Sequence, residues 1–170
     1  LGRAYGVELL LRHKLSERFF GWISYTLMRA TERDHPGDAF IITDRDQTHI
    51  LTVIASYRPW RNFEAGLRFR LVSGNPYTPV SGSTHDLDTL GWPSIRGAPR
   101  SERLPTFHQL DLRLEYTSTY DLFTVSYFLD LLNAYNAKNV EDFQYGYRKR
   151  EKVNFNGLPI VPVLGVRGEF

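Results

Sequence analysis

The sequence contains no cysteine, a single methionine and no long run of apolar residues. The absence of cysteine excludes disulfide bonds and thiolate metal sites. Because no window of about 18 residues is apolar throughout, the sequence predicts no transmembrane helix. Lys plus Arg (21) nearly balance Asp plus Glu (19), so no strong field of one sign attracts nucleic acid. We therefore expect no nucleic-acid partner.

The first residues, LGRAYGVELL, lack a charged segment followed by an apolar run, so no signal peptide is predicted. Leu1 leads almost directly into an alternating pattern. With 170 residues the chain is long enough for one domain. We expect it to be a fragment or a processed piece of a longer protein.

Seven stretches alternate between apolar and polar residues with a period of two, which predicts β-strands. They are residues 4–15, 19–30, 48–57, 62–74, 107–116, 122–135 and a closing stretch that ends at Phe170. The fifth is very regular, with Leu112 and Leu114 on one face and Asp111 and Arg113 on the other. The sequence therefore predicts an all-β protein of about seven meandering antiparallel strands.

Short and long connections alternate strictly between these strands. Three connections have about five residues or fewer, and three are long: residues 31–47, 75–105 and 136–157. Long loops are uncommon in compact soluble domains. Bacterial membrane barrels combine short periplasmic turns with long outer loops. The pattern therefore favours a transmembrane β-barrel segment whose last strand ends at the periplasmic face.

The polar faces of the predicted strands carry charges of both signs in mid-strand, which can pair across a watery lumen. The candidates for lumen-facing side chains are Glu64, Arg68, Arg70, Gln109, Asp111, Arg113, Glu115 and Asp130. Such side chains either line a solute path or solvate and cross-link the inner wall of the barrel. We favour the second, structural role.

Aromatic residues begin or end the apolar faces, and most of them lie next to the short turns. They are Phe19, Tyr57, Phe63, Tyr116, Phe123 and Phe170. Aromatic rings gathered at one level are typical of a membrane interface. A soluble β-domain, with its apolar face turned inward, remains an alternative. Seven strands cannot close a bacterial single-chain barrel, which needs an even number, so the strand count supports a fragment.

Three stretches resemble the C-terminal barrel of TonB-dependent outer-membrane receptors. They are GLRFRLVSGNPYTP (66–79), RLPTFHQLDLRLEY (103–116) and YFLDLLNAYNAKN (127–139), the last with an Asp-x-x-Asn-x-x-Asn run. The terminal Phe170, with Val166 and Leu164, resembles the signal read by the barrel assembly machinery. Gly168 departs from that signal, where a large apolar residue is more usual.

The resemblance implies a 22-stranded barrel with an N-terminal plug, of which residues 1–170 supply the last strands. It implies a bacterial outer-membrane receptor for a scarce siderophore-, cobalamin- or carbohydrate-like nutrient, taken up by energised transport. The implied partners are outer-membrane lipid, lipopolysaccharide, the remaining barrel and plug, the TonB complex, the assembly machinery and a small-molecule ligand. A passive pore or a structural or adhesive barrel is the first alternative, and a soluble β-domain binding small apolar ligands is the second.

The long loops supply candidates for contact with an anionic or aromatic ligand; the alternatives are that these residues contact lipopolysaccharide or pack on neighbouring loops. These are Trp92, Phe143, Tyr145, Tyr147 and Arg148, beside the further cations Lys149, Arg150 and Lys152. Loop acids near histidines (Asp34, Asp38, Asp44, Asp46, His35 and His49, and His85 with Asp86 and Asp88) do not have the spacing of an EF-hand loop. No nucleophile elbow is present. We predict neither a metal site, nor a cofactor, nor an enzyme.

Overall fold

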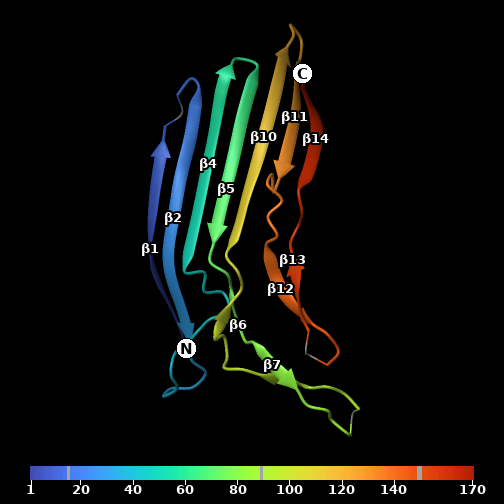
Figure 1. Cartoon of the computed structure of the whole chain (residues 1–170). Helices are drawn as coiled ribbons and strands as arrows, with labels where there is room; N and C mark the ends of the chain where they lie inside the picture. The colour runs from blue at the N-terminus through green and yellow to red at the C-terminus, as the bar shows by residue number, and fades with distance from the viewer. Residues whose placement is uncertain (15, 89, 149–150) are drawn as a thin grey trace.

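The protein is an all-β structure, described by a computed structural model for residues 1–14, 16–88, 90–148 and 151–170 (Figure 1). Seven long strands cross the molecule: β1 (Gly2–His13), β2 (Phe19–Glu32), β4 (His49–Trp60), β5 (Phe63–Val72), β10 (Phe107–Thr119), β11 (Thr124–Leu132) and β14 (Val161–Glu169). No helix long and apolar enough to cross a membrane occurs in the described residues.

The long strands form one antiparallel sheet in the order β1-β2-β4-β5-β10-β11-β14, so each strand pairs with the next long strand of the chain. This confirms the predicted all-β class and the meander of seven strands. The sheet is open in the described residues, because β1 and β14 each pair with one long strand only. A closed barrel is therefore not observed.

The short and long connections lie at opposite ends of the sheet. Figure 1 shows the turns β1–β2, β4–β5 and β10–β11 at one end, together with the C-terminus, and the long loops at the other. We call these the short-turn end and the long-loop end.

The long loops, expected as plain connections, contain short strands instead. These are β3 (Ile41–Ile42), β6 (Pro76–Tyr77), β7 (Val80–Ser83), β8 (Ser94–Arg96), β9 (Glu102–Arg103), β12 (Val140–Tyr145) and β13 (Lys152–Asn156). β3 pairs with β2, and the others form the two-stranded ladders β6-β9, β7-β8 and β12-β13. The second and third long loops are therefore folded hairpins that extend beyond the sheet.

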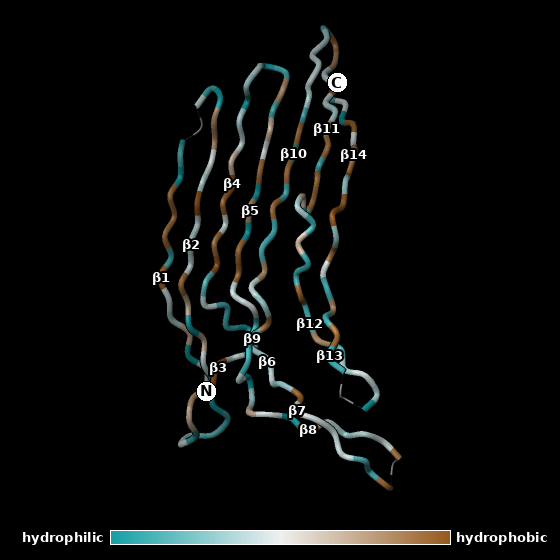
Figure 2. The backbone as a smooth tube through the Cα atoms, viewed as in Figure 1, coloured by the Kyte–Doolittle hydropathy of each residue, from teal (hydrophilic) through white to brown (hydrophobic). Residues whose placement is uncertain are grey.

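The sheet has an apolar face and a polar face, because the register places like residues opposite one another. Leu67, Leu112 and Leu131 form one cross-strand row, and the next position pairs Asp111 with Arg68. Figure 2 shows the same alternation along each long strand. We name the two sides the apolar face and the polar face.

The apolar face is the more exposed of the two along β10. Leu112 is 37% exposed and Leu114 is 43% exposed, whereas Asp111 is 7% exposed. Among the described residues, Val72 is the one buried hydrophobic side chain, while Asp46, Asp111, Asn133 and Asn139 are buried polar ones. The burial pattern is thus the inverse of that in a water-soluble domain, which hides its leucines and exposes its charges.

Two of the stretches that carry the family resemblance contact each other directly at the long-loop end. A Cβ added to Gly74 would lie 1.7 Å from the carbonyl oxygen of Leu104. The Leu104 amide also donates to Asn75 O at 3.0 Å, and Pro76 pairs with Arg103 across β6-β9. Glycine is required at position 74 because the backbone after β5 runs against the backbone before β10.

The asparagine run of the third stretch fixes the exit from β11. Asn133 and Asn136 have φ angles of 52° and 54°, a left-handed conformation that asparagine tolerates better than most residues. Asn133 Nδ2 donates to the carbonyls of Ala137 and Leu158, both at 3.0 Å, and Asn136 Oδ1 accepts from the Ile160 amide at 3.1 Å. The run therefore joins the end of β11 to the start of β14.

A further asparagine at the same spacing, Asn139, joins β10 to the same turn. Asn139 Oδ1 accepts from the His108 amide at 3.0 Å, and its Nδ2 donates to the His108 carbonyl at 2.9 Å. The side chain thus satisfies both backbone groups of one residue, as a neighbouring strand would. All three asparagines of the stretch 127–139 therefore have a structural explanation.

We predict that Gly74→Ala destabilises the protein by about 1–3 kcal/mol, because the added methyl group overlaps the Leu104 carbonyl. The matched control is Gly82→Ala, since a Cβ at Gly82 meets nothing within 4 Å. Unfolding in urea followed by tryptophan fluorescence measures both. Equal midpoints for the two variants would contradict the close contact.

Candidate functional site

The polar face is organised around Asp111, in the middle of β10. Arg68, directly opposite on β5, donates to Asp111 Oδ2 through Nε at 2.9 Å and Nη2 at 2.6 Å. The other carboxylate oxygen accepts from Gln109 Nε2 at 2.6 Å and from the Asn133 amide at 3.0 Å. Four donors therefore satisfy one almost fully buried carboxylate, as burial of a charge requires.

A second network surrounds Arg113, two residues further along β10. Its Nη1 donates to both oxygens of Asp130, at 3.0 and 2.8 Å, and its Nη2 donates to Glu115 at 2.7 Å. The guanidinium also lies over the Phe128 ring, 4.5 Å from the centroid. Phe128 in turn lies against Gly165, where an added Cβ would be 2.2 Å from the ring. The network thus couples β10, β11 and β14.

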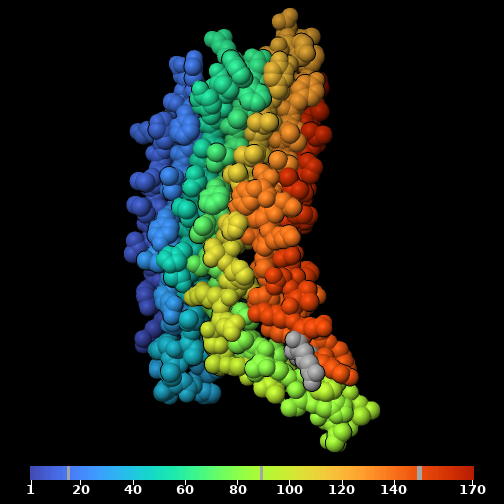
Figure 3. Space-filling model, viewed as in Figure 1, coloured from blue at the N-terminus to red at the C-terminus, as the bar shows by residue number. Residues whose placement is uncertain are grey.

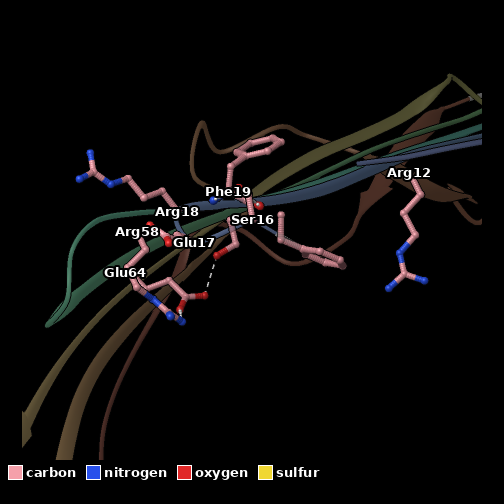
Figure 4. Close-up of a pocket in the computed structure, with 9 residues that line it drawn as sticks. Arg12, Ser16, Glu17, Arg18, Phe19, Arg58 and Glu64 are labelled. Carbon is pink, nitrogen blue, oxygen red and sulfur yellow. Dashed lines mark hydrogen bonds and ion pairs between the residues drawn. The ribbon is translucent and has the colours of Figure 1, made fainter. Parts of the chain in front are cut away.

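A third group lies on the polar face near the short-turn end, beside a pocket of about 320 Å³. Glu64 accepts from Ser56 Oγ at 2.6 Å and from Arg58 Nη2 at 2.7 Å. Figure 4 shows Arg58 and Glu64 side by side, whereas Arg12 stands apart and Arg18 points away. The group is a local ion pair with two further cations at its margin.

Arg70 differs from the other predicted lumen-facing cations, because it forms no ion pair with any described residue. Its guanidinium lies over the Phe107 ring, 5.3 Å from the centroid. It lines a pocket of about 210 Å³ with Gln47, Asn75 and Glu141, just below the long loops. Among the predicted lumen-facing cations, Arg70 is therefore the one that remains open to a solute.

All eight residues predicted to face a lumen lie on the one polar face. Seven of them form the three networks: Arg68, Gln109 and Asp111; Arg113, Glu115 and Asp130; and Glu64 with Arg58. These contacts cross-link neighbouring strands, which agrees with the structural role favoured for them. Of the eight residues, Arg70 alone keeps the candidate role of guiding a solute.

Above the polar face, the long loops are joined through Asp46, which is fully buried. Its carboxylate accepts from the Ala30 amide at 2.6 Å and from Thr48 Oγ1 at 3.1 Å, and it forms an ion pair with Arg103. Arg29 Nη1 lies 3.9 Å away. The first long loop is thereby attached to β9 of the second, 57 positions along the chain. Asp46 is therefore engaged by arginines rather than open to a cation.

The ionised form of Asp46 is favoured despite its burial. Burial alone opposes ionisation, but the hydrogen bonds from the Ala30 amide, Arg103 and Thr48 outweigh it and lower the pKa of Asp46 below its ordinary value of 3.8. The carboxylate consequently keeps its negative charge at neutral pH.

Four of the five predicted ligand-contact residues of the long loops fall into two clusters. In the first, Phe143 lies 5.1 Å from Tyr77, and Lys152 Nζ lies 3.6 Å above the Phe143 ring. Lys152 donates to the Tyr77 hydroxyl at 2.8 Å, and that hydroxyl donates to Glu102. The hydrogen bond from Lys152 to Tyr77 raises the pKa of Lys152. Burial and the hydrogen bond to Glu102 raise the pKa of Tyr77. Both groups are protonated at neutral pH.

The second cluster joins the tips of two loops. Trp92 lies 5.0 Å from the His85 ring, and the Arg148 guanidinium lies 5.5 Å from the Trp92 ring. The Tyr147 hydroxyl donates to the Leu90 carbonyl at 3.2 Å. Figure 3 shows the β7–β8 region lying against the β12–β13 region beyond the sheet. These residues therefore hold one loop against another, which is the structural alternative to ligand contact.

The remaining predicted residues lie outside these clusters. Tyr145 pairs with Lys152 across β12-β13, whereas Lys149 and Arg150 lie outside the described residues. Leu164 and Val166 project from the apolar face of β14 and are 81% and 66% exposed. Phe170 is fully exposed, 6.3 Å from Phe123. The assembly-signal role of these three residues stays a prediction.

Several well-connected residues were not among the sequence-derived candidates. Arg103, Tyr77 and Glu102 have no distinctive spacing, because their partners lie far away in the chain. Asn133 and Asn139 did have a signal, the repeated asparagine at every third position. Within the part of the chain that the structure describes, no three His, Asp or Glu side chains are grouped closely enough to hold a metal ion.

We predict that Asp111→Ala lowers the free energy of unfolding by about 2–3 kcal/mol, because Arg68, Gln109 and the Asn133 amide lose their shared acceptor. The control is Asp121→Ala, which removes an exposed acid in a short turn. Urea unfolding of both variants gives the comparison. If the free energy of unfolding falls only in the Asp121 variant, or in neither variant, the cross-linking role of Asp111 is contradicted.

We predict that Asp46→Asn loosens the long loops at neutral pH but not in acid. A group whose folded pKa is depressed stabilises the fold fully above its unfolded value, here 3.8, and loses that contribution as pH falls through the folded pKa. Hydrogen exchange of the Ala30 amide, compared with the control Asp44→Asn, measures the effect. The difference in the protection of the Ala30 amide between the Asp46→Asn and Asp44→Asn variants should be constant above pH 3.8 and shrink below it.

No protein-family model, curated protein or solved structure matches the chain. The likeness to TonB-dependent receptors therefore depends on the three sequence stretches and the terminal phenylalanine. The geometry of the two faces is an independent observation from which a function can be inferred.

Proposed function

We propose that this chain forms the C-terminal wall segment of a TonB-dependent receptor in a bacterial outer membrane. In this proposal the apolar face contacts lipid and the polar face lines an aqueous lumen. The long loops form part of the outer mouth, and the last strand carries the assembly signal. The inverted burial of β10, with exposed leucines and a sheltered aspartate, is the observation that supports it most directly.

The exposed leucines favour hydrocarbon over water as the medium on the apolar face. Leu9, Leu11 and Leu164 are 55%, 57% and 81% exposed. Burying apolar surface is favourable by about 25 cal/mol per Å², so a continuous apolar face of seven strands would aggregate in water. Lipid covers such a face without a protein partner.

The open edges support the view that the chain is one part of a barrel. Within hydrocarbon, backbone N–H and C=O groups must be paired inside the protein, so free strand edges are not viable. In the described residues β1 and β14 each leave one edge free of a long strand. In our proposal the remaining strands of the barrel pair with both edges.

Energised uptake follows from the family resemblance. We propose that a plug contributed by the rest of the receptor fills the lumen and that the TonB complex moves this plug. The wall networks keep the barrel rigid during that movement, while Arg70 faces the outer entrance. The transported nutrient is of the siderophore, cobalamin or carbohydrate class. A passive pore or a structural or adhesive barrel would share the wall but not the gate.

The orientation of the faces can be tested with single cysteines, because the chain contains no cysteine of its own. In outer membranes we expect Arg113→Cys and Glu115→Cys to react with a water-soluble maleimide. The neighbouring Leu112→Cys and Leu114→Cys should react only after detergent is added. The reverse pattern, or recovery of the protein in the aqueous fraction without detergent, overturns the membrane-wall proposal in favour of a soluble β-domain.

Energised transport needs a separate experiment on the full receptor. Uptake of candidate nutrients is measured in cells with and without TonB, and conductance of the purified protein is measured in planar bilayers. We expect TonB-dependent uptake and low conductance. Steady conductance together with TonB-independent uptake would indicate the passive pore, and neither activity would indicate a structural or adhesive barrel.

A further inference from the structure

Three arginines lie on the apolar face of β1 and β2, at the long-loop end of the sheet. Arg3 shares its face of β1 with Val7 and Leu9, and Arg29 lies directly opposite Tyr5 on β2. Arg33 and Leu1 exchange backbone hydrogen bonds just beyond Gly2↔Glu32, which places Arg33 on the same face as Arg3. We call Arg3, Arg29 and Arg33 the arginine patch.

Phe40 forms the centre of the patch. The Arg3 guanidinium lies 4.0 Å from the Phe40 ring centroid and the Arg33 guanidinium lies 4.8 Å from it. Two cations are thereby held on one aromatic ring, although like charges repel. Such a pair of positive charges is stabilised further when an anion binds between or above them.

The patch has unused donors. Neither Arg3 nor Arg33 forms an ion pair with another residue of the described chain, and Arg33 Nε is buried without an acceptor. Arg29 has only a long contact of 3.9 Å with Asp46, and its side chain is 42% exposed. The nearby acid Asp38 is already paired with His35. The guanidinium groups of Arg3 and Arg33 therefore have no acidic partner in the described chain and are free to bind an anion from outside it.

The short-turn end of the apolar face is different. It presents the aromatic side chains of Phe19, Tyr57, Phe63 and Tyr116 instead of arginines. The two ends of one lipid-facing surface are thus chemically unlike: rings at one and cations at the other. A membrane whose two leaflets carry different headgroups would match this difference.

We infer that the arginine patch binds the phosphate groups of lipopolysaccharide, the phosphorylated glycolipid of the outward-facing leaflet. The inference depends on the proposed membrane function, which places the long loops outside. Guanidinium groups bind phosphate through paired, charge-assisted hydrogen bonds. Val7, Leu9 and Leu27 lie below the patch on the same face, where acyl chains of the same lipid would run. A bound lipid would then steady the first long loop through Phe40.

The test uses the complete receptor in detergent and two purified probes, diphosphorylated lipid A and the same lipid without phosphates. Native mass spectrometry measures the bound fraction. We expect the double variant Arg3→Gln/Arg33→Gln to weaken binding of the phosphorylated probe roughly tenfold or more. A tenfold change corresponds to the loss of about one strong charge-assisted hydrogen bond between the protein and the lipid. Arg3→Lys/Arg33→Lys should retain part of this binding. The dephosphorylated lipid should bind all proteins weakly and equally.

The matched control is Arg12→Gln, on the polar face of the same strand, where the guanidinium lies 5.6 Å from the Phe20 ring. This variant should bind the phosphorylated probe as well as the unchanged protein does. Equal loss in both variants, equal binding of the two probes, or full displacement by millimolar inorganic phosphate overturns the inference.

The outcome is separable from that of the proposed function. Cysteine accessibility reports whether the apolar face meets lipid, irrespective of which lipid binds the patch. A correct accessibility pattern without phosphate-dependent binding removes the lipopolysaccharide site and leaves the membrane wall standing. A reversed accessibility pattern removes both.

Discussion

A period of two residues, kept in register over seven strands, is the constraint on which the whole structure depends. Because strand side chains alternate, a slip of one residue between any two strands would move leucines to the polar face and charges to the apolar face. The pairs Leu112↔Leu67 and Asp111↔Arg68 show the register at the centre of the sheet. The same constraint creates both candidate surfaces, one for lipid and one for water.

The long strands and their two faces could be predicted from the sequence because alternation is a local pattern. The partners of the charged residues could not, since Arg68 and Asp111 lie 43 positions apart and meet only through the register. Asp46 shows the same limit more clearly. In the sequence it is one of several loop acids, and only the fold brings Arg103 to it. The short strands of the loops have no alternation long enough to be predicted.

The resemblance and the structure explain different aspects of the same residues. The family stretches suggest an outer-membrane receptor, while the contacts show why those residues suit their positions. Gly74 allows two backbones to meet, and the asparagines replace backbone partners at a turn. The local structure explains Gly74 and the asparagines fully, so these residues indicate the architecture of the sheet rather than the identity of a solute. In the proposed receptor, specificity for a solute would therefore lie in the loops and around Arg70.

The asparagine turn also bears on the order in which the sheet is assembled. Twenty-eight residues separate β11 from β14 (133–160), and closing a loop of that length carries an entropic cost. Asn133 and Asn136 bridge the two ends of this loop through Leu158 and Ile160. Strand β14 can thus pair with β11 before the intervening hairpin has folded. Strand β14 then becomes an early, ready-made edge of the sheet.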